Sequence, residues 1–305
     1  MILHYNEISL TRKAVESVKA LDIKQHEAEI VVVDNGSPNK TGKALLKEYD
    51  GDDKVHVILT GENGGFSKGN NVGFSYIKNE LYQDAAPDFV IALNNDITFP
   101  QRDFLQRLAD VYEKSSPRFY VAGPDVFTPH IRSHISPLSK CVRGKSEAQE
   151  AIDVLVNVNE GFKKGFSFAN YSRYLQEKYQ GTGILNFYNS LRKGEYDGAT
   201  PHNQPAYDCV LNGACLIFDR RYVEEYDVLF EEKTFLYVEE DFLTKRLTDV
   251  NKSIRYCPEL VVSHVGQGSS GFKGMNYREY VKKNICTNEK VIDSWKIYIE
   301  YVDRL

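Results

Sequence analysis

Three consecutive acidic residues are the clearest candidates for chemistry in this sequence. Glu239, Glu240 and Asp241 open a helical pattern that also carries Lys245 and Arg246. Acids at a helix start often only complement the helix dipole, which accounts for one or two of the three. Adjacent carboxylates also repel one another, and a raised pKa on one of them suits a general base. The run is therefore consistent with a helix start and with a proton acceptor.

A second candidate site is the tripeptide Asn94–Asn95–Asp96, which follows the apolar run Phe89–Leu93. Hard cations such as Mg²⁺ and Mn²⁺ use one or two protein carboxylates together with substrate phosphates, so Asp96 could be such a ligand. A turn built from Asn and Asp side chains is the plain alternative, and the tripeptide alone favours it. His264 follows another apolar run, but a lone histidine there is more often structural than a ligand.

Asp34 ends a run of four β-branched residues, Ile30–Val33, which predicts a strand buried on both faces. Its carboxylate can accept hydrogen bonds from a ribose or a base edge, or it can simply cap the following turn. Asp34 and Asp96 both come at or just after the carboxyl end of a predicted strand. That edge is where α/β sheets bind ligands.

A loop rich in Gly and Asn, 61–73, follows the predicted strand Val55–Leu59. Glycines allow the backbone to approach a ligand, and successive N–H groups before a helix make an anion site. Lys68 adds a positive charge, and Asn70 and Asn71 add amide donors. The loop matches neither the GxxxxGK[ST] phosphate loop nor the GxGxxG dinucleotide motif.

The elements that must position these residues alternate between strand and helix in the first half of the chain. This order implies a parallel sheet with right-handed crossovers. Ser9 is the expected N-cap of the first helix. Apolar runs and helical stripes predict strands over 2–4, 30–33, 55–59 and 89–93, helices over 9–21, 41–49, 72–81 and around 104–111, and further regular structure over 209–218, 239–250 and 260–264.

The regular pattern weakens from about residue 127 to 207, where Ser, Lys, Gly and Tyr dominate. We expect an inserted, partly helical region there. Beyond it, the tail 277–305 has an amphipathic helical pattern with a break near 287–288. The following aromatic residues would be exposed if that helix stood alone: Tyr280, Trp295, Tyr298 and Tyr301.

The charge of the tail from residue 276 to 305 is +1, from six basic and five acidic side chains. This charge is too small for a strongly electrostatic membrane anchor. We therefore expect the tail to pack on the catalytic domain or to form a homodimer contact. Weak peripheral membrane contact is the minority alternative.

Composition restricts the class of protein. The 305 residues are 42% hydrophobic and 27% charged, which is ordinary for a globular protein, and the net charge of −5 disfavours general nucleic-acid binding. No apolar run approaches the length of a membrane span, and the N-terminal pattern is not that of a signal peptide. Five cysteines without a CxxC spacing suggest reduced thiols and a cytoplasmic protein.

Six motifs taken together resemble those of family 2 glycosyltransferases of the GT-A fold, particularly the bacterial rhamnosyltransferase-like branch. Their order and spacing are more specific than any one motif, and the resemblance covers roughly 1–126 and 208–272. The motifs are His4–Tyr5–Asn6, Val32–Val33–Asp34–Asn35–Gly36–Ser37, Asn63–Gly64–Gly65–Phe66 with Gly69–Asn70–Asn71, Leu93–Asn94–Asn95–Asp96, Asn212–Gly213–Ala214–Cys215 and Phe235–Leu236–Tyr237–Val238–Glu239–Glu240.

The resemblance implies an α/β GT-A fold with a mostly parallel central sheet, related to the Rossmann arrangement. Residues 1–126 would form the half that binds the nucleotide-sugar, and 208–272 the acceptor and catalytic half. Residues 127–207 would be an insertion on the acceptor side, and 273–305 a C-terminal helical extension.

The implied activity is transfer of a sugar, with rhamnose as a candidate, from a UDP- or dTDP-sugar to a hydroxyl of a cell-surface polysaccharide or its lipid-linked precursor. The anomeric centre would be inverted, in the cytoplasm or at the inner face of the membrane. Residues implied to bind the nucleotide-sugar are Tyr5, Asn6, Asp34, Asn63, Gly64, Phe66, Lys68, Asn70, Asn94 and Asn95.

The resemblance also implies a Mn²⁺ or Mg²⁺ cofactor, with Asp96 in the metal motif and His264 as a second ligand. The acidic run matches the family's Glu-Asp motif, whose second member is the catalytic base. That position is Glu240 here, a departure from the usual Asp, and Asp241 is the neighbouring alternative, with Glu239 completing the run. Asn94 replaces the first Asp of the metal motif, which leaves fewer carboxylates for the ion.

Two other functions fit parts of the pattern. A nucleotidyltransferase also places a nucleotide and a metal on an α/β sheet, but it would lack the acidic helix start paired with His264. A glycan- or nucleotide-binding module without catalysis is the other, and the intact Asp96 and acidic run count against it.

Overall fold

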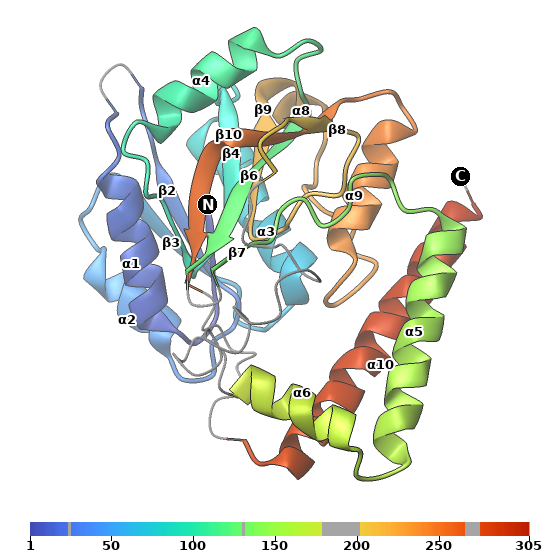
Figure 1. The fold of residues 1–305 in the computed structure, drawn as a ribbon. Coiled ribbons are helices and arrows are strands. Elements are labelled where there is room, and N and C mark those ends of the chain that lie inside the picture. The colour runs from blue at the N-terminus through green and yellow to red at the C-terminus, as the bar shows by residue number, and fades with distance from the viewer. Residues whose placement is uncertain (24–25, 130–131, 179–201, 266–274, 305) are drawn as a thin grey trace.

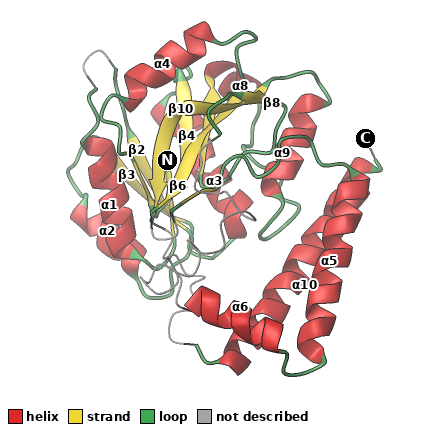
Figure 2. Ribbon diagram, in the orientation of Figure 1, coloured by secondary structure: helices red, strands yellow, loops and turns green. Residues whose placement is uncertain are grey.

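A mixed β-sheet forms the centre of the computed structural model, which describes residues 1–23, 26–129, 132–178, 202–265 and 275–304. Within these residues the sheet has ten strands, and its main path runs β3-β2-β1-β4-β9-β6-β10-β5. Helices cover both faces, and a group of helices from the insertion and the tail stands beside the sheet (Figure 1, Figure 2).

The first half of the sheet is parallel, as the alternating pattern predicts. β1 pairs with β2 and β4, and β2 pairs with β3, all in parallel. The elements of this half are β1 (Ile2–His4), α1 (Ile8–Lys19), β2 (Ile30–Asp34), α2 (Thr41–Glu48), β3 (Val55–Leu59), α3 (Gly65–Tyr76), the π-helical turn η1 (Ile77–Leu81), β4 (Phe89–Asn94), β5 (Ile97–Thr98) and α4 (Phe104–Lys114).

The second half mixes directions, because β9 lies antiparallel between β4 and β6. β6 and β10 then pair in parallel, so the carboxyl ends of β1, β2, β4, β6 and β10 point toward one edge (Figure 1). The elements of this half are β6 (Val121–Thr128), β7 (Ser133–His134), β8 (Ala206–Tyr207), β9 (Cys215–Asp219), α8 (Arg220–Glu225), α9 (Glu239–Thr248) and β10 (Ile254–His264).

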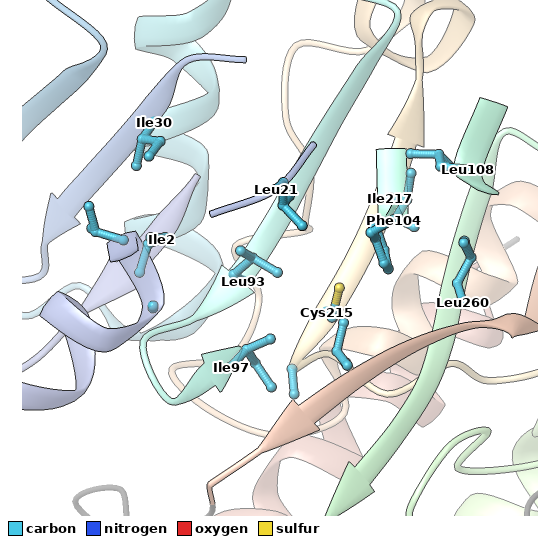
Figure 3. Packing of buried hydrophobic residues seen from close by; sticks show 14 of the residues in the cluster. Ile2, Leu21, Ile30, Leu93, Ile97, Phe104, Leu108, Cys215, Ile217 and Leu260 are labelled. Atoms are coloured by element: carbon cyan, nitrogen blue, oxygen red, sulfur yellow. The ribbon is translucent and has the colours of Figure 1, made fainter. Parts of the chain in front are cut away.

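The strands are buried on both faces, which explains their runs of β-branched residues. In β2, Ile30 and Val32 belong to the core under α1, α2 and α4, whereas Val31 and Val33 belong to the core under α3, α8 and α9. Figure 3 shows part of the first core. Covering both faces leaves the strand ends as the place where polar residues can reach a ligand.

The insertion and the tail form one helical unit. α5 (Lys145–Lys163) packs along α10 (Tyr277–Val302), and α6 (Phe168–Lys178) contacts the start of α10. The insertion is thus partly helical, as expected, although 179–201 lie outside the described residues. The tail packs on α5 and also on α9, which buries Trp295 and Tyr298.

Three expectations about elements are wrong, and one strand was missed. α10 has no break at 287–288, because the polar stretch there faces α5, where Asn288 donates to Asn159. Ser9 is not the N-cap of α1; Glu7 holds that position without a side-chain bond. α3 begins at Gly65, well inside the predicted loop. β6 was not predicted, because a Gly-Pro-Asp sequence interrupts its apolar pattern.

Candidate functional site

The acidic run lies at the start of α9, on a strained backbone. Tyr237 and Val238 both have positive φ, at 80° and 73°, immediately before Glu239. Positive φ is a genuine outlier for a β-branched residue, and such strain persists only where the surroundings enforce it. Here Asp241 N and Phe242 N both donate to the Val238 carbonyl and hold the turn closed.

Glu240 is half-buried and is held by the turn that leads into β9. Its Oε1 accepts a hydrogen bond of 3.0 Å from the backbone N–H of Gly213. A Cβ at Gly213 would lie 2.4 Å from the same oxygen, so the approach requires glycine there. Burial raises the pKa of Glu240, while the hydrogen bond from Gly213 and the charge of Arg143 oppose that rise.

Asp241 is buried and forms an ion pair with Arg143, with 2.8 Å between Nε and Oδ1. The Arg143 guanidinium also lies 5.2 Å from the centre of the Trp295 ring. Burial raises the pKa of Asp241 to about 7 even though Arg143 lowers it. Arg143 belongs to the insertion and Trp295 to α10, so both extra regions support the acidic helix.

Glu239 is also buried, and its Oε1 has no hydrogen-bond partner among the described residues. Burial, followed by the nearby charge of Glu240, raises its pKa. The three acids point into different surroundings, since neighbours on a helix are about 100° apart. Of the three, Glu240 combines a fixed position with partial exposure.

Asp96 and His264 come together at the carboxyl edge of the sheet. His264 Nε2 lies 3.2 Å from Asp96 Oδ2, and Asp96 is buried. His264 Nδ1 is buried without a partner in the described part of the chain. Neighbouring strands connect this pair to Glu240, because Asn94 N donates to the Ala214 carbonyl, one residue from Gly213.

Asp34 ends β2 as a buried carboxylate. Ser37 N donates to its Oδ1 at 3.3 Å, and a Cβ on Gly42 would lie 2.1 Å from its Oδ2. The nearby His4 is fully buried, and its ring nitrogens bond to the hydroxyls of Thr11 and Thr41. Burial lowers the pKa of His4, and Asp34 opposes that effect.

The backbone of the Gly/Asn segment is not an open anion site, which corrects the prediction. Gly64 N donates to Asn35 Oδ1, and Gly65 N donates to Asn63 Oδ1. The next N–H, at Phe66, donates to the Phe235 carbonyl. The N–H groups of Gly64, Gly65 and Phe66 are therefore already used by the protein.

Asn70 and Asn71 are buried and do not present amide donors to a ligand, which is a second correction. Asn70 Nδ2 donates to the Phe66 carbonyl within α3. Asn71 accepts from the N–H groups of Leu229 and Phe230 and donates to the Phe230 carbonyl and to Glu232. The start of α3 thus anchors the segment that leads into the acidic helix.

The other predicted binding residues lie around the same edge. Tyr5 is half-buried, and Asn6 has a positive φ of 63° with its N–H bonded to Ser37. Lys68 is exposed on α3. Asn95 Nδ2 donates to Thr11 Oγ1 at 3.1 Å, which ties the metal motif to α1.

Sequence reasoning missed the supporting residues Arg143, Gly213 and Gly42. It also missed Asp125 and His134, whose Oδ2 and Nδ1 are 2.6 Å apart in β6 and β7. Arg143 lies in the weakly patterned insertion and has no motif around it. Gly213 was part of a quoted motif, but only the structure shows that its missing side chain makes room for Glu240.

No described helix is both long and apolar enough to cross a bilayer.

Comparison with known proteins places this chain in a family. The match to the model described as glycosyl transferase family 2 covers residues 1–181, more than half of the chain. The chain is 31% identical over 110 residues to the low-salt glycan biosynthesis hexosyltransferase Agl10 of Haloferax volcanii, over 36% of this chain and 33% of the relative. It is 27% identical over 168 residues to the dTDP-rhamnosyl transferase RfbF of Shigella flexneri, over 54% and 50%.

These matches span a third to a half of the length of the two relatives. The crystal structure of GalNAc-T7 with UDP, GalNAc and Mn²⁺ matches 98% of this chain and 48% of that one, with a TM-score of 0.55 and 16% identity. That likeness confirms the expected GT-A fold. From the match to the family model together with this fold, the chain belongs to glycosyl transferase family 2.

Proposed function

We propose that the chain transfers a hexosyl group, with rhamnose as a candidate, from a UDP- or dTDP-sugar to a hydroxyl of a cell-surface polysaccharide or its lipid-linked precursor. The relatives support this proposal, since one is named a hexosyltransferase and the other a dTDP-rhamnosyl transferase. The observation that carries it is the Glu240 carboxylate, fixed by the Gly213 N–H beside the strand ends that bear Asp96 and His264.

Glu240 is our candidate for the base that takes the proton from the attacking hydroxyl of the acceptor. Inversion needs a single displacement, so one carboxylate within hydrogen-bond reach of the attacking hydroxyl is sufficient. Asp241 is buried against Arg143, which leaves it poorly placed to meet an acceptor. Glu240 is half-buried, and its Oε1 is held by Gly213, so its other oxygen can face the acceptor.

The proposed reaction is a single displacement with inversion at the anomeric carbon. The acceptor oxygen attacks the anomeric carbon from the side opposite the departing diphosphate, while Glu240 removes its proton. The raised pKa that burial gives Glu240 makes it a better proton acceptor than an ordinary carboxylate.

Asp96 and His264 fit a divalent metal bound together with the donor. A buried carboxylate oxygen and an imidazole nitrogen 3.2 Å apart are a donor set that Mn²⁺ accepts. The described residues contain no group of three or more His, Cys, Asp or Glu arranged around a metal, so phosphate oxygens and water would complete the site. A bound ion would offset the charge of the leaving diphosphate.

The nucleotide would lie along the parallel half of the sheet, with the Asp34 carboxylate accepting hydrogen bonds from the nucleoside. His4 supports this role, because burial favours its neutral form and so leaves the charge of Asp34 uncompensated. Tyr5, Asn6, Asn63 and Lys68 surround the same edge and remain candidates for donor contact.

A donor screen tests the proposal. The purified chain is incubated with a panel of UDP- and dTDP-sugars, with Mn²⁺ or with EDTA and with water in place of the acceptor hydroxyl, and released nucleoside diphosphate is measured. We expect release from a subset of donors, dependent on the metal and lost in Glu240→Gln. No release from any sugar donor, together with release of pyrophosphate when the chain is given a nucleoside triphosphate and a sugar 1-phosphate, would indicate nucleotidyl transfer. Calorimetric binding of a nucleotide-sugar without any release would indicate a binding module, and either result would overturn the proposal.

A further inference from the structure

The turn between α5 and α6 exposes two phenylalanines. Phe166 is 70% exposed and Phe168 is 82% exposed, the two highest values among the large hydrophobic residues that the structure describes as exposed. Just beneath them the aromatic rings are packed, since Phe162, Tyr174 and Tyr280 are 5% exposed or less. Phe166 also contacts the rings of Tyr171 and Tyr277, so aromatic packing holds this turn.

Basic residues are frequent in the segments that carry these rings and pack against them. We define the basic tip as residues 163–175, which end α5 and begin α6, together with residues 277–285 at the start of α10. The tip carries six basic side chains and one acidic, a local charge of +5 in a chain whose net charge is −5. The basic residues are Lys163, Lys164, Arg173, Arg278, Lys282 and Lys283.

This concentration of charge arises only when the chain is folded. The tail counted alone carries +1, because its acidic residues lie mainly beyond residue 285. Packing of the aromatic rings from α5, α6 and α10 brings two basic segments together that are about a hundred residues apart in the chain. Lys163 Nζ also lies 3.9 Å from Glu289 Oε1. Both side chains are exposed, so salt strongly screens the attraction between them.

The basic tip lies on the same side of the molecule as the candidate site. β6 and β10 point toward the side on which α6 lies, and α10 begins there (Figure 1). A surface that contacts the tip would therefore face the edge of the sheet where Asp96, His264 and Glu240 lie.

We propose that the basic tip docks the protein on an anionic lipid bilayer. Exposed aromatic rings enter the boundary between headgroups and acyl chains, while the surrounding Lys and Arg side chains meet the negative headgroups. A second copy is the weaker occupant, because a symmetric contact would oppose two patches of the same charge. This inference does not depend on which sugar is transferred, and it stands apart from the proposed function.

Sedimentation with vesicles tests the docking. The full chain is mixed with vesicles of phosphatidylglycerol and phosphatidylcholine, or of phosphatidylcholine alone, at low and at high salt. We expect binding to the anionic vesicles that weakens with salt, since screening reduces the attraction between exposed charges. Equal binding to neutral vesicles, or no binding to anionic ones at low salt, would overturn the proposal.

Variants locate the contact. Phe166→Ser combined with Phe168→Ser should reduce partitioning by at least about tenfold, because two apolar rings can no longer enter the bilayer. Lys164→Gln combined with Lys282→Gln should weaken binding mainly at low salt. Leu46→Ser, at an exposed apolar position on α2, is the matched control and should bind as the parent does.

Circular dichroism and light scattering complete the test of the docking surface. Circular dichroism of every variant should match the parent, because these side chains are exposed and no core packing is removed. If both tip variants partition as the parent does, the tip is not the docking surface. If light scattering shows a dimer that the Phe variants abolish while vesicle binding is unchanged, the tip is an interface between copies and the proposal is wrong.

Discussion

The two sides of the candidate site differ in how several of their polar groups are held. On the parallel side, Asn35 and Asn71 are buried and make hydrogen bonds through both their oxygen and nitrogen atoms, and each ring nitrogen of His4 meets a hydroxyl. On the acidic side, Glu239 has a buried oxygen without a partner among the described residues, and burial raises the pKa of all three acids.

From this difference we infer that the two sides of the site perform separate tasks. A satisfied network is rigid, which suits a surface that must hold a nucleotide in one position. A group of buried carboxyls with raised pKa values is poised to take up a proton, which suits the chemical step. Changes on the parallel side should therefore alter binding, and changes on the acidic side should alter turnover.

The largest expected effect is that of Glu240→Gln. Loss of a general base typically lowers the rate by about 10²–10⁴. We expect a fall of that size in kcat, measured by release of nucleoside diphosphate, with nucleotide affinity retained in calorimetry. Asp241→Asn is the control beside it; if that variant is inactive and Glu240→Gln is fully active, the base is Asp241.

Gly213→Ala should lower kcat by about 10²-fold, the cost of misplacing a reacting group by about an ångström. The added Cβ would lie 2.4 Å from Glu240 Oε1 and would displace the carboxylate. Gly161→Ala is the matched control, because no atom lies within 4 Å of its added Cβ. Equal turnover in the two variants would show that the position of Glu240 does not matter.

On the parallel side, Asp34→Ala should weaken nucleotide binding by about tenfold or more, the loss of one or more hydrogen bonds to a charged group. Gly42→Ala should act in the same direction, because its Cβ would meet the Asp34 carboxylate at 2.1 Å. Calorimetry with UDP and dTDP measures both variants. Unchanged affinity with normal circular dichroism would remove Asp34 from the site.

The smallest expected effect is a shift in pH dependence. The charge of Arg143 lowers the pKa of Glu240 and of Asp241 and so favours their ionised forms. Arg143→Gln should therefore raise both pKa values and move the acid limb of the pH–kcat profile upward by about one unit. Arg143→Lys, which keeps the charge, should leave the limb nearly in place; an unmoved limb in Arg143→Gln would exclude Glu240 as the titrating base.

Much of the parallel side could be predicted from sequence, because its signals are local. Four β-branched residues that end on Asp34 predict a buried strand with a carboxylate at its end, and the structure has both. The alternation of strands and helices also predicts the parallel order of β1 to β4.

The features that could not be predicted from sequence depend on contacts between distant segments. The sequence does not reveal the helix start at Gly65, because the flanking N–H groups of Gly64 and Phe66 donate to Asn35 Oδ1 and to the Phe235 carbonyl, both distant along the chain. The pairing of Arg143 with Asp241 joins the insertion to α9, and no local pattern encodes it. The positive φ at Val238 is likewise contrary to the preference of its own side chain.

The most direct test of the division between the two sides measures both quantities on two variants in parallel. Nucleotide affinity by calorimetry and kcat by nucleoside diphosphate release are determined for Asp34→Ala and Glu240→Gln against the parent. We predict that Asp34→Ala loses affinity and keeps kcat at saturating donor, whereas Glu240→Gln keeps affinity and loses kcat. If both variants lose the same quantity, or if Glu240→Gln loses only affinity, the two sides of the site do not have separate tasks and the account is wrong.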